Sequence, residues 1–154
     1  GFRPDPQEYA ALRWNTRDGT RASVFNCALW LEDTQLSLAM LNDSGDSTVL
    51  PSDGSEERIC VGARSLDSVL DELELGESPI KLLKIEAEGA EPEVLLGAQH
   101  ALSLTEWVAA DLGPERGPEN ASTLPECSNF LHESGFVMVA FNAERCTALF
   151  RKKC

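Results

Sequence analysis

The chain has 154 residues and a formal net charge of −13, because 26 acidic side chains outnumber 13 basic ones. So much negative charge disfavours nucleic-acid backbones and anionic membranes as partners, and no apolar run of about 18 residues or more is available to span a bilayer. Its 42% hydrophobic and 25% charged residues are typical of a globular protein that buries roughly 70% of its unfolded surface. We therefore expect one domain.

The cysteines and the first residues of the chain indicate the cellular compartment. Five cysteines are an odd number, and they form no CxxC pair and no zinc-ligand spacing with histidine. This pattern favours free intracellular thiols, with Cys154 exposed at the terminus. Residues 1–9, GFRPDPQEY, contain no apolar signal-peptide core. We expect a cytoplasmic protein without a bound metal.

The first third of the chain contains one helix and two strands by its pattern. Asp5 before Pro6 predicts a helix start, with aspartate as the cap and proline at the first helical position. Residues 21–31, RASVFNCALWL, are rich in strand-forming residues, and residues 34–41 alternate polar and apolar side chains as a half-exposed antiparallel strand does. Residues 42–57 predict a mobile loop, whose acidic residues indicate a solvated surface because their spacing fits no EF-hand.

Strands and helices alternate in the remainder, and residues 113–120, GPERGPEN, form a turn-rich loop of the kind that carries function. This order predicts an α/β fold with a mostly parallel sheet, covered by helices on both faces and closed by a C-terminal antiparallel hairpin. The expected strands are 59–63, 80–85, 107–112, 136–141 and 147–151, and the expected helices are 65–75, 91–97 and 124–134.

Residues 80–97, IKLLKIEAEGAEPEVLLG, are the most informative stretch. They predict a buried strand, a tight turn and a helix, with the carboxylates of Glu86, Glu88 and Glu91 around Gly89. Glycine at this point predicts a tight or positive-φ turn. Because ligands of open α/β sheets bind beyond the carboxyl ends of the strands, the cluster is a candidate site as well as a turn.

Residues 84–91, KIEAEGAE, resemble the KIDVEGAE signature of the FkbM-type S-adenosylmethionine-dependent methyltransferases. Residues 2–6, FRPDP, resemble the family's FEPDP, residues 65–67 resemble its TLD, and residues 108–112 match a strand that ends in an acid. The resemblance covers nearly the whole chain. It implies a Rossmann-like class I methyltransferase sheet and O-methylation of hydroxyls of sugars and secondary metabolites, with S-adenosylmethionine as the cofactor.

Three departures from the family pattern shape the expectation for this chain. The glycine-rich DVGANxG loop is absent, so we expect an N-terminally truncated domain over 1–154 that lacks the first strand, that loop and the first helix. The acid expected to hold the ribose hydroxyls falls on Arg3, which donates hydrogen bonds but cannot accept them. The signature aspartate is Glu86, one methylene longer. Binding of S-adenosylmethionine is therefore expected to be weak or absent.

Glu86 and Glu88 are the candidate catalytic residues. They lie on the same side of the strand if it persists through them, where one of them can orient or deprotonate an acceptor hydroxyl. The alternative is structural: the two carboxylates pair with Lys81 or Lys84, or accept hydrogen bonds from backbone amides in the turn.

The resemblance also implies binding residues on other segments. Asp111 and Glu115, after the strand at 107–112, are candidates for contact with the acceptor. Asn26, Ala28 and Leu29 resemble the segment that lines the adenine pocket of the family. The alternative is that they serve only in ordinary strand packing. The candidate cofactor-binding residues are Arg3, Asp5, Asn26, Ala28 and Leu29.

Other polar residues are expected to serve the fold. Asp67 suits a helix cap, with a role in the site as the lesser alternative. Glu91 and Glu93 suit the positive end of the helix that they begin. His100 and His132 have no cysteine or carboxylate at ligand spacing, so both are expected at the surface or as caps.

Two functional hypotheses follow. The first is an O-methyltransferase in which positioning of the acceptor dominates catalysis and Glu86 or Glu88 assists deprotonation. The second is a non-catalytic binding or scaffold module with the same fold. In both, a missing central strand leaves open sheet edges, so we expect a homo-oligomer. Its other partner is a small hydroxyl-bearing acceptor.

Overall fold

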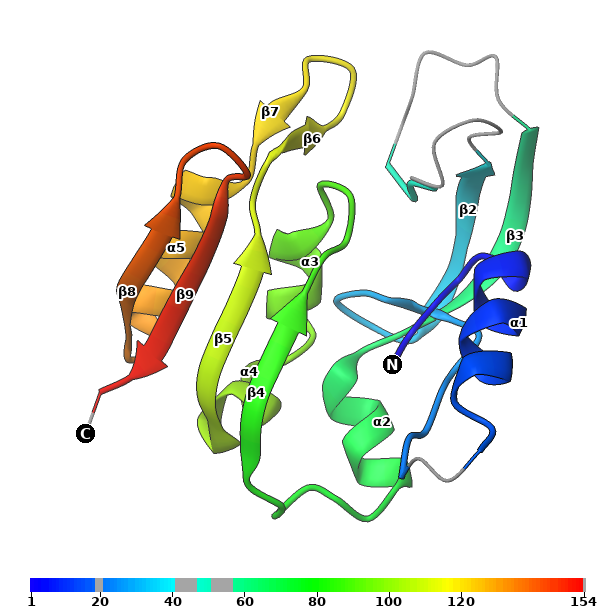
Figure 1. Ribbon diagram of the computed structural model, residues 1–154, viewed down its shortest axis with the longest axis horizontal. Coiled ribbons are helices and arrows are strands. Elements are labelled where there is room, and N and C mark those ends of the chain that lie inside the picture. The colour runs from blue at the N-terminus through cyan, green and yellow to red at the C-terminus, as the bar shows by residue number, and fades with distance from the viewer. Residues whose placement is uncertain (19–20, 41–46, 51–56, 154) are drawn as a thin grey trace.

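The computed structural model describes residues 1–18, 21–40, 47–50 and 57–153. The loop expected over 42–57, apart from 47–50 and 57, and the terminal Cys154 lie outside the described residues. The strands form a three-stranded sheet in the order β1-β3-β2, a four-stranded sheet in the order β4-β5-β9-β8, and a small β6-β7 hairpin (Figure 1). Their bounds are β1 Ala28–Leu29, β2 Thr34–Met40, β3 Glu57–Arg64, β4 Ile80–Ile85, β5 Thr105–Asp111, β6 Pro114–Arg116, β7 Ala121–Ser122, β8 Phe136–Asn142 and β9 Thr147–Lys152.

The sheets are mixed, so the expectation of a mostly parallel sheet is wrong. β1 pairs with β3 and β4 pairs with β5 in parallel, whereas β2 with β3, β5 with β9 and β8 with β9 are antiparallel. The turn between β8 and β9 is too short for the crossover of about a dozen residues that parallel pairing requires. The expected C-terminal hairpin is therefore confirmed, and so is the antiparallel direction of β2.

The helices follow the expected order, with one addition. Asp5 caps the first helix, since its carboxylate accepts hydrogen bonds from the backbone amides of Gln7 at 2.7 Å and Glu8 at 3.2 Å. The second helix ends at Glu72, three residues before the expected end at 75, and the fourth helix was not expected. The helices are α1 Pro6–Asn15, α2 Leu66–Glu72, α3 Glu91–Leu96, α4 Gln99–Leu104 and α5 Leu124–Glu133.

The single strand expected over 21–31 is wrong. Of these residues only Ala28–Leu29 pair with another strand, β3, and Phe25 forms an isolated parallel bridge to Phe2. The apolar residues serve instead to hold the N-terminal segment: the rings of Phe2 and Phe25 stack with centroids 5.1 Å apart. The backbone amide of Arg3 donates to the Phe25 carbonyl at 3.0 Å. In place of one continuous strand there are two short pairings, of Phe25 with Phe2 and of β1 with β3.

Helices α3, α4 and α5 lie against one face of the four-stranded sheet (Figure 1). Their apolar side chains meet those of β5, β8 and β9 in the main core, and fully burying one such side chain contributes about 1.5–3 kcal/mol. None of the helices that the structure describes is both long and apolar enough to cross a membrane. The fully buried members include Leu95, Leu102, Val108, Leu131, Phe136 and Phe150.

The two sheets are joined at a corner between α2 and the α3–α4 connection. The carboxylate of Asp67, on α2, accepts hydrogen bonds from the backbone amides of His100 and Ala101, both at 2.9 Å. Asp67 thus caps a helix as expected, but that helix is α4; its own helix is capped by Ser65. Gly97 lies so close to the first sheet that a Cβ there would be 2.0 Å from the Trp30 carbonyl oxygen.

Candidate functional site

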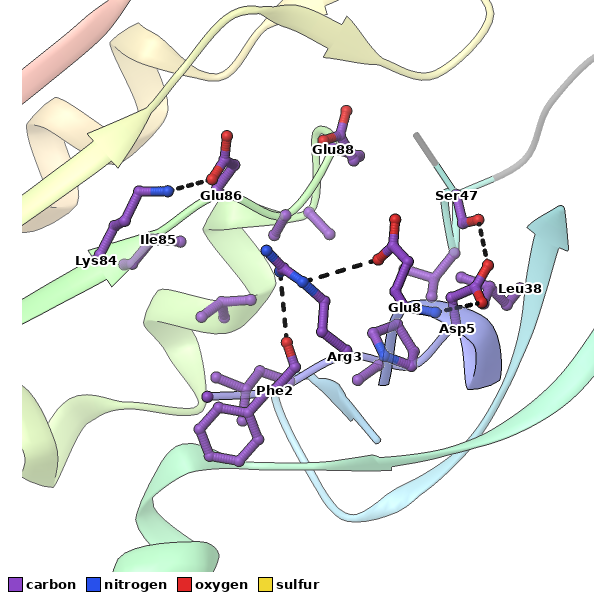
Figure 2. Close-up of a pocket in the computed structure, with 18 of the residues that line it drawn as sticks. Phe2, Arg3, Asp5, Glu8, Leu38, Ser47, Lys84, Ile85, Glu86 and Glu88 are labelled. Carbon is purple, nitrogen blue, oxygen red and sulfur yellow. Dashed lines mark hydrogen bonds and ion pairs between the residues drawn. The ribbon is translucent and has the colours of Figure 1, made fainter. Parts of the chain in front are cut away.

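A pocket of about 530 Å³ lies between the two sheets, beside the carboxyl end of β4 (Figure 2). Its size is within the usual range for small-molecule and cofactor sites, about 300–1,000 Å³. The N-terminal segment, β1 and β2 supply one wall, and β4 with the residues that follow it supplies the other. The apolar lining includes Phe2, Ala28, Leu29, Leu38, Leu83 and Ile85, and the polar lining includes Arg3, Asp5, Glu8, Ser47, Lys84, Glu86 and Glu88.

Residues 86–89, which we call the acidic turn, carry the chain from β4 towards α3. The strand ends at Ile85, so Glu86 and Glu88 do not share a strand face. Glu88 and Gly89 both have positive φ, 49° and 88°, which confirms the conformation expected of Gly89. A Cβ on Gly89 would lie 2.7 Å from Arg116 Cα and 2.8 Å from the Glu115 carbonyl oxygen, so only glycine fits there.

Glu91 holds the acidic turn from the inside of the protein. Its side chain is only 1% exposed, and Oε1 accepts hydrogen bonds from the backbone amides of Ala87 at 2.8 Å and Gly89 at 3.3 Å. Oε2 accepts one from Thr123 Oγ1 at 3.0 Å. Glu91 was expected to favour the start of α3; it also ties that helix to the turn and to the residue before α5.

Arg116 holds the acidic turn from the other side. Its Nη1 donates to the Gly89 carbonyl at 2.7 Å and to Glu93 Oε2 at 2.9 Å, and Nη2 donates to Glu93 Oε1 at 2.7 Å. The hydrogen bonds from Arg116 to Glu93 raise the pKa of the guanidinium. This contact attaches the β6–β7 hairpin to the turn, and sequence reasoning did not assign Arg116 any role.

The two candidate catalytic carboxylates both line the pocket, on the acidic turn (Figure 2). Glu86 forms an ion pair with Lys84, as the structural alternative anticipates. Both side chains of that pair are exposed, and exposed pairs contribute only about 0–1 kcal/mol, so a ligand can compete with Lys84 for the carboxylate. The carbonyl of Glu88 accepts a hydrogen bond from Thr48 Oγ1 at 3.3 Å, which links the acidic turn to the segment that contains Ser47.

Arg3 and Asp5 line the opposite wall. Arg3 extends from the N-terminal segment towards the acidic turn (Figure 2), and its Nε lies 3.7 Å from Glu8 Oε2. Asp5 is 7% exposed; besides capping α1 it accepts a hydrogen bond from Ser47 Oγ at 3.3 Å. Its carboxylate is thus already bound by the protein, whereas the Arg3 guanidinium is half-exposed.

The structure brings together six of the nine predicted site residues. Asn26 points to the N-terminal segment, where its side-chain amide donates to the Arg3 and Pro4 carbonyls at 2.9 and 3.1 Å. Asp111 ends β5 and Glu115 lies on β6, and neither is part of the pocket lining. The six in the pocket are Arg3, Asp5, Ala28, Leu29, Glu86 and Glu88.

Comparison with known proteins gives the family and the fold of this chain. The family model described as the methyltransferase FkbM domain matches residues 1–138. The fold is similar to the crystal structure of methyltransferase FkbM from Methylobacillus flagellatus KT, with a TM-score of 0.61 and 16% sequence identity over 97% of this chain and 35% of that one. The chain therefore spans about a third of the length of that protein. No curated protein sequence matches the chain significantly.

Proposed function

We propose that this chain, which belongs to the FkbM methyltransferase family, serves the transfer of a methyl group from S-adenosylmethionine to a hydroxyl oxygen. The acceptor would be a small molecule such as a sugar or a secondary metabolite. The observation that carries the proposal is the pocket at the carboxyl end of β4, whose lining includes the acidic turn of the family signature. Open α/β sheets bind their ligands at such a point.

The pocket suits S-adenosylmethionine in charge and in surface character. Four carboxylates and two cationic side chains line it, and this excess of negative charge favours a ligand with a sulfonium cation. Ala28, Leu29 and Leu83 offer an apolar surface for a purine ring. The bound cofactor would supply an electrophilic methyl group.

The residues of the chain would bind and orient the acceptor. Glu88 and Glu86, in the pocket lining, can accept a hydrogen bond from an acceptor hydroxyl and take up its proton as the oxygen reacts. The hydrogen bonds from the Ala87 and Gly89 amides to Glu91 hold the turn that carries these carboxylates. Such positioning can supply a large part of the rate enhancement in a displacement between two bound molecules.

We expect the affinity of this chain for S-adenosylmethionine to be weak, in the millimolar range. The family pattern calls for an acid at the position of Arg3, and a guanidinium cannot accept hydrogen bonds from ribose hydroxyls. Arg3→Glu restores an acceptor there. The substitution is expected to tighten binding about tenfold, the factor that one hydrogen bond of about 1.4 kcal/mol provides.

Titration followed by protein NMR tests the proposal, with S-adenosylmethionine added to millimolar concentration. The amides of residues 28–29 and 86–89 should shift in a saturable way, and more readily in Arg3→Glu than in a control variant, Arg145→Glu, which makes the same charge change in the β8–β9 turn. A micromolar dissociation constant for the unaltered chain would show that the weak-binding expectation is wrong. If no pocket amide shifts in either chain, the methyltransferase proposal fails and a non-catalytic binding module becomes the better explanation.

A further inference from the structure

Arg116 lies on β6, outside the pocket lining, yet it contacts the segment that carries both candidate catalytic carboxylates. The β6–β7 hairpin follows β5, the neighbour of β4, and lies beside the β4–α3 connection (Figure 1). The Arg116 guanidinium donates hydrogen bonds to the Gly89 carbonyl and to both carboxylate oxygens of Glu93. It thereby joins β6, the acidic turn and α3. The Glu93 side chain is 15% exposed and that of Arg116 is 30% exposed, so water competes little with this pairing.

The acidic turn requires such support. Glu88 has a φ of 49° and Gly89 a φ of 88°, and the left-handed conformation is unfavourable for a residue with a Cβ such as glutamate. Strained conformations of this kind persist when surrounding contacts determine them. Glu91 accepts hydrogen bonds from the Ala87 and Gly89 amides, and Arg116 donates one to the Gly89 carbonyl, so the turn is held from both sides.

We propose that Arg116 is a positioning residue of the pocket: through Gly89 and Glu93 it holds the acidic turn in the conformation that places Glu86 and Glu88 in the pocket lining. The effect on ligand binding rests on the proposed function, whereas the effect on the turn does not. A planar guanidinium with two parallel donors suits this task, because it binds Glu93 bidentately and still reaches the carbonyl. A lysine has one nitrogen and cannot reproduce this arrangement.

Three variants separate the contacts. Arg116→Gln removes the ion pair and the charged donor to Gly89, and Arg116→Lys keeps the charge without the fork. Glu93→Gln weakens only the ion pair and leaves the Gly89 contact, so it remains informative if the arginine variants fold poorly. Arg145→Gln, an exposed arginine in the β8–β9 turn, is the matched control for charge and side-chain type.

Amide hydrogen exchange measures the turn directly. Exchange at Ala87 and Gly89 should accelerate about tenfold or more in Arg116→Gln, since a hydrogen bond to a charged group contributes at least that factor. Arg116→Lys and Glu93→Gln should give smaller increases. Amides in β8 and β9 should exchange at the rate of the unaltered chain, which separates a local effect on the turn from general destabilisation.

Titration of the same variants with S-adenosylmethionine gives the second readout. Arg116→Gln should weaken binding about threefold to tenfold, and Arg145→Gln should not. Unchanged exchange at Ala87 and Gly89 would overturn the inference, and so would accelerated exchange with unchanged affinity. If neither the unaltered chain nor Arg3→Glu shows binding, the proposed function is overturned; accelerated exchange confined to the turn would then still support the role of Arg116 in holding it.

Discussion

Gly89 is enclosed on one side by the backbone of the β6–β7 hairpin. A Cβ at this position would have Arg116 Cα, Arg116 N and the Glu115 carbonyl oxygen as its nearest neighbours, all within 2.9 Å. None of these is the flexible end of a side chain, so the hairpin must move to admit even a methyl group. The conformation of the acidic turn at Gly89 and the position of the β6–β7 hairpin therefore depend on each other.

Gly89→Ala is therefore expected to destabilise the protein by about 2 kcal/mol or more, from the unfavourable positive φ together with the backbone clash. Urea unfolding followed by circular dichroism measures the change. Gly62→Ala is the matched control, because nothing lies within 4 Å of a Cβ on Gly62, in β3. Equal stability of the two variants would show that the hairpin yields to the methyl group.

At this scale the sequence predicts the turn better than the contacts that hold it. The KIEAEGAE motif indicates both the glycine conformation and the carboxylates that line the pocket. The partners of the turn could not be predicted, because Arg116 lies 23 residues from Glu93 and Thr123 lies 32 residues from Glu91 along the chain. No local pattern distinguishes these side chains from ordinary surface residues.

Among the elements, α2 begins at a cluster of polar contacts with the segment before β2. Asp33 Oδ1 accepts hydrogen bonds from Ser68 Oγ at 2.6 Å and from the Ser65 amide at 2.9 Å, and Oδ2 lies 3.3 Å from Arg64 Nε. These contacts, the one with Ser68 foremost, lower the pKa of Asp33. The carboxylate thus attaches the start of the helix to the first sheet.

The contribution of Asp33 should depend on pH. Because its pKa is lowered in the folded protein, the stabilisation is fully present above the unfolded-state pKa of about 3.9 and is lost as the pH falls through the folded value. The side chain is 48% exposed, so solvent screening limits the effect to about 1 kcal/mol or less. Asp33→Asn should unfold more readily than the unaltered protein at pH 6 but equally at about pH 2. Asp18→Asn, at an exposed acid, is the control in denaturant unfolding at both pH values.

The corner at Gly97 gives a second prediction among the elements. Gly97→Ala places a methyl group 2.0 Å from the Trp30 carbonyl oxygen, so α3 and α4 must move away from the first sheet. Overpacking of this kind is expected to lower the unfolding free energy by about 1–3 kcal/mol. Because the pocket lies between the same two sheets, its amides should shift in the NMR spectrum. A spectrum changed only at residues 96–98 would contradict this expectation.

Most helix starts and strand positions could be predicted, since caps and periodicity are local signals. The failure at 21–31 is instructive: the segment is apolar because Phe25 packs against Phe2, and composition alone cannot distinguish such a contact from a strand. Likewise α4 was not expected, because Gly97 indicates the end of a helix but gives no sign that another begins at Gln99.

For the whole molecule, the arrangement of two sheets follows from which strands pair, and pairing depends on contacts distant in sequence. β1 and β4 lie at the ends of their sheets, and the pocket lies between them. Among the described residues β4 pairs with β5 alone, and four of the six residues in its sequence, IKLLKI, are apolar. Leu82 on this strand is 54% exposed.

We expect β4 to mediate association between copies of the chain, because an apolar edge strand pairs readily with another strand. Leu82→Lys should shift the protein towards the monomer, since lysine on an edge opposes pairing. Leu75→Lys is the control, as Leu75 is 41% exposed outside any strand. Light scattering after size-exclusion chromatography gives the mass of each. A monodisperse monomer of the unaltered chain would show that this expectation is wrong.

The cap that Asp67 provides to α4 has a consequence for the order of folding. The helix is six residues long, too short to be stable by itself in water, and its capping side chain comes from 33 residues earlier in the chain. We therefore expect α4 to become ordered as α2 docks beside it, so that closing the long loop between them contributes to the folding barrier.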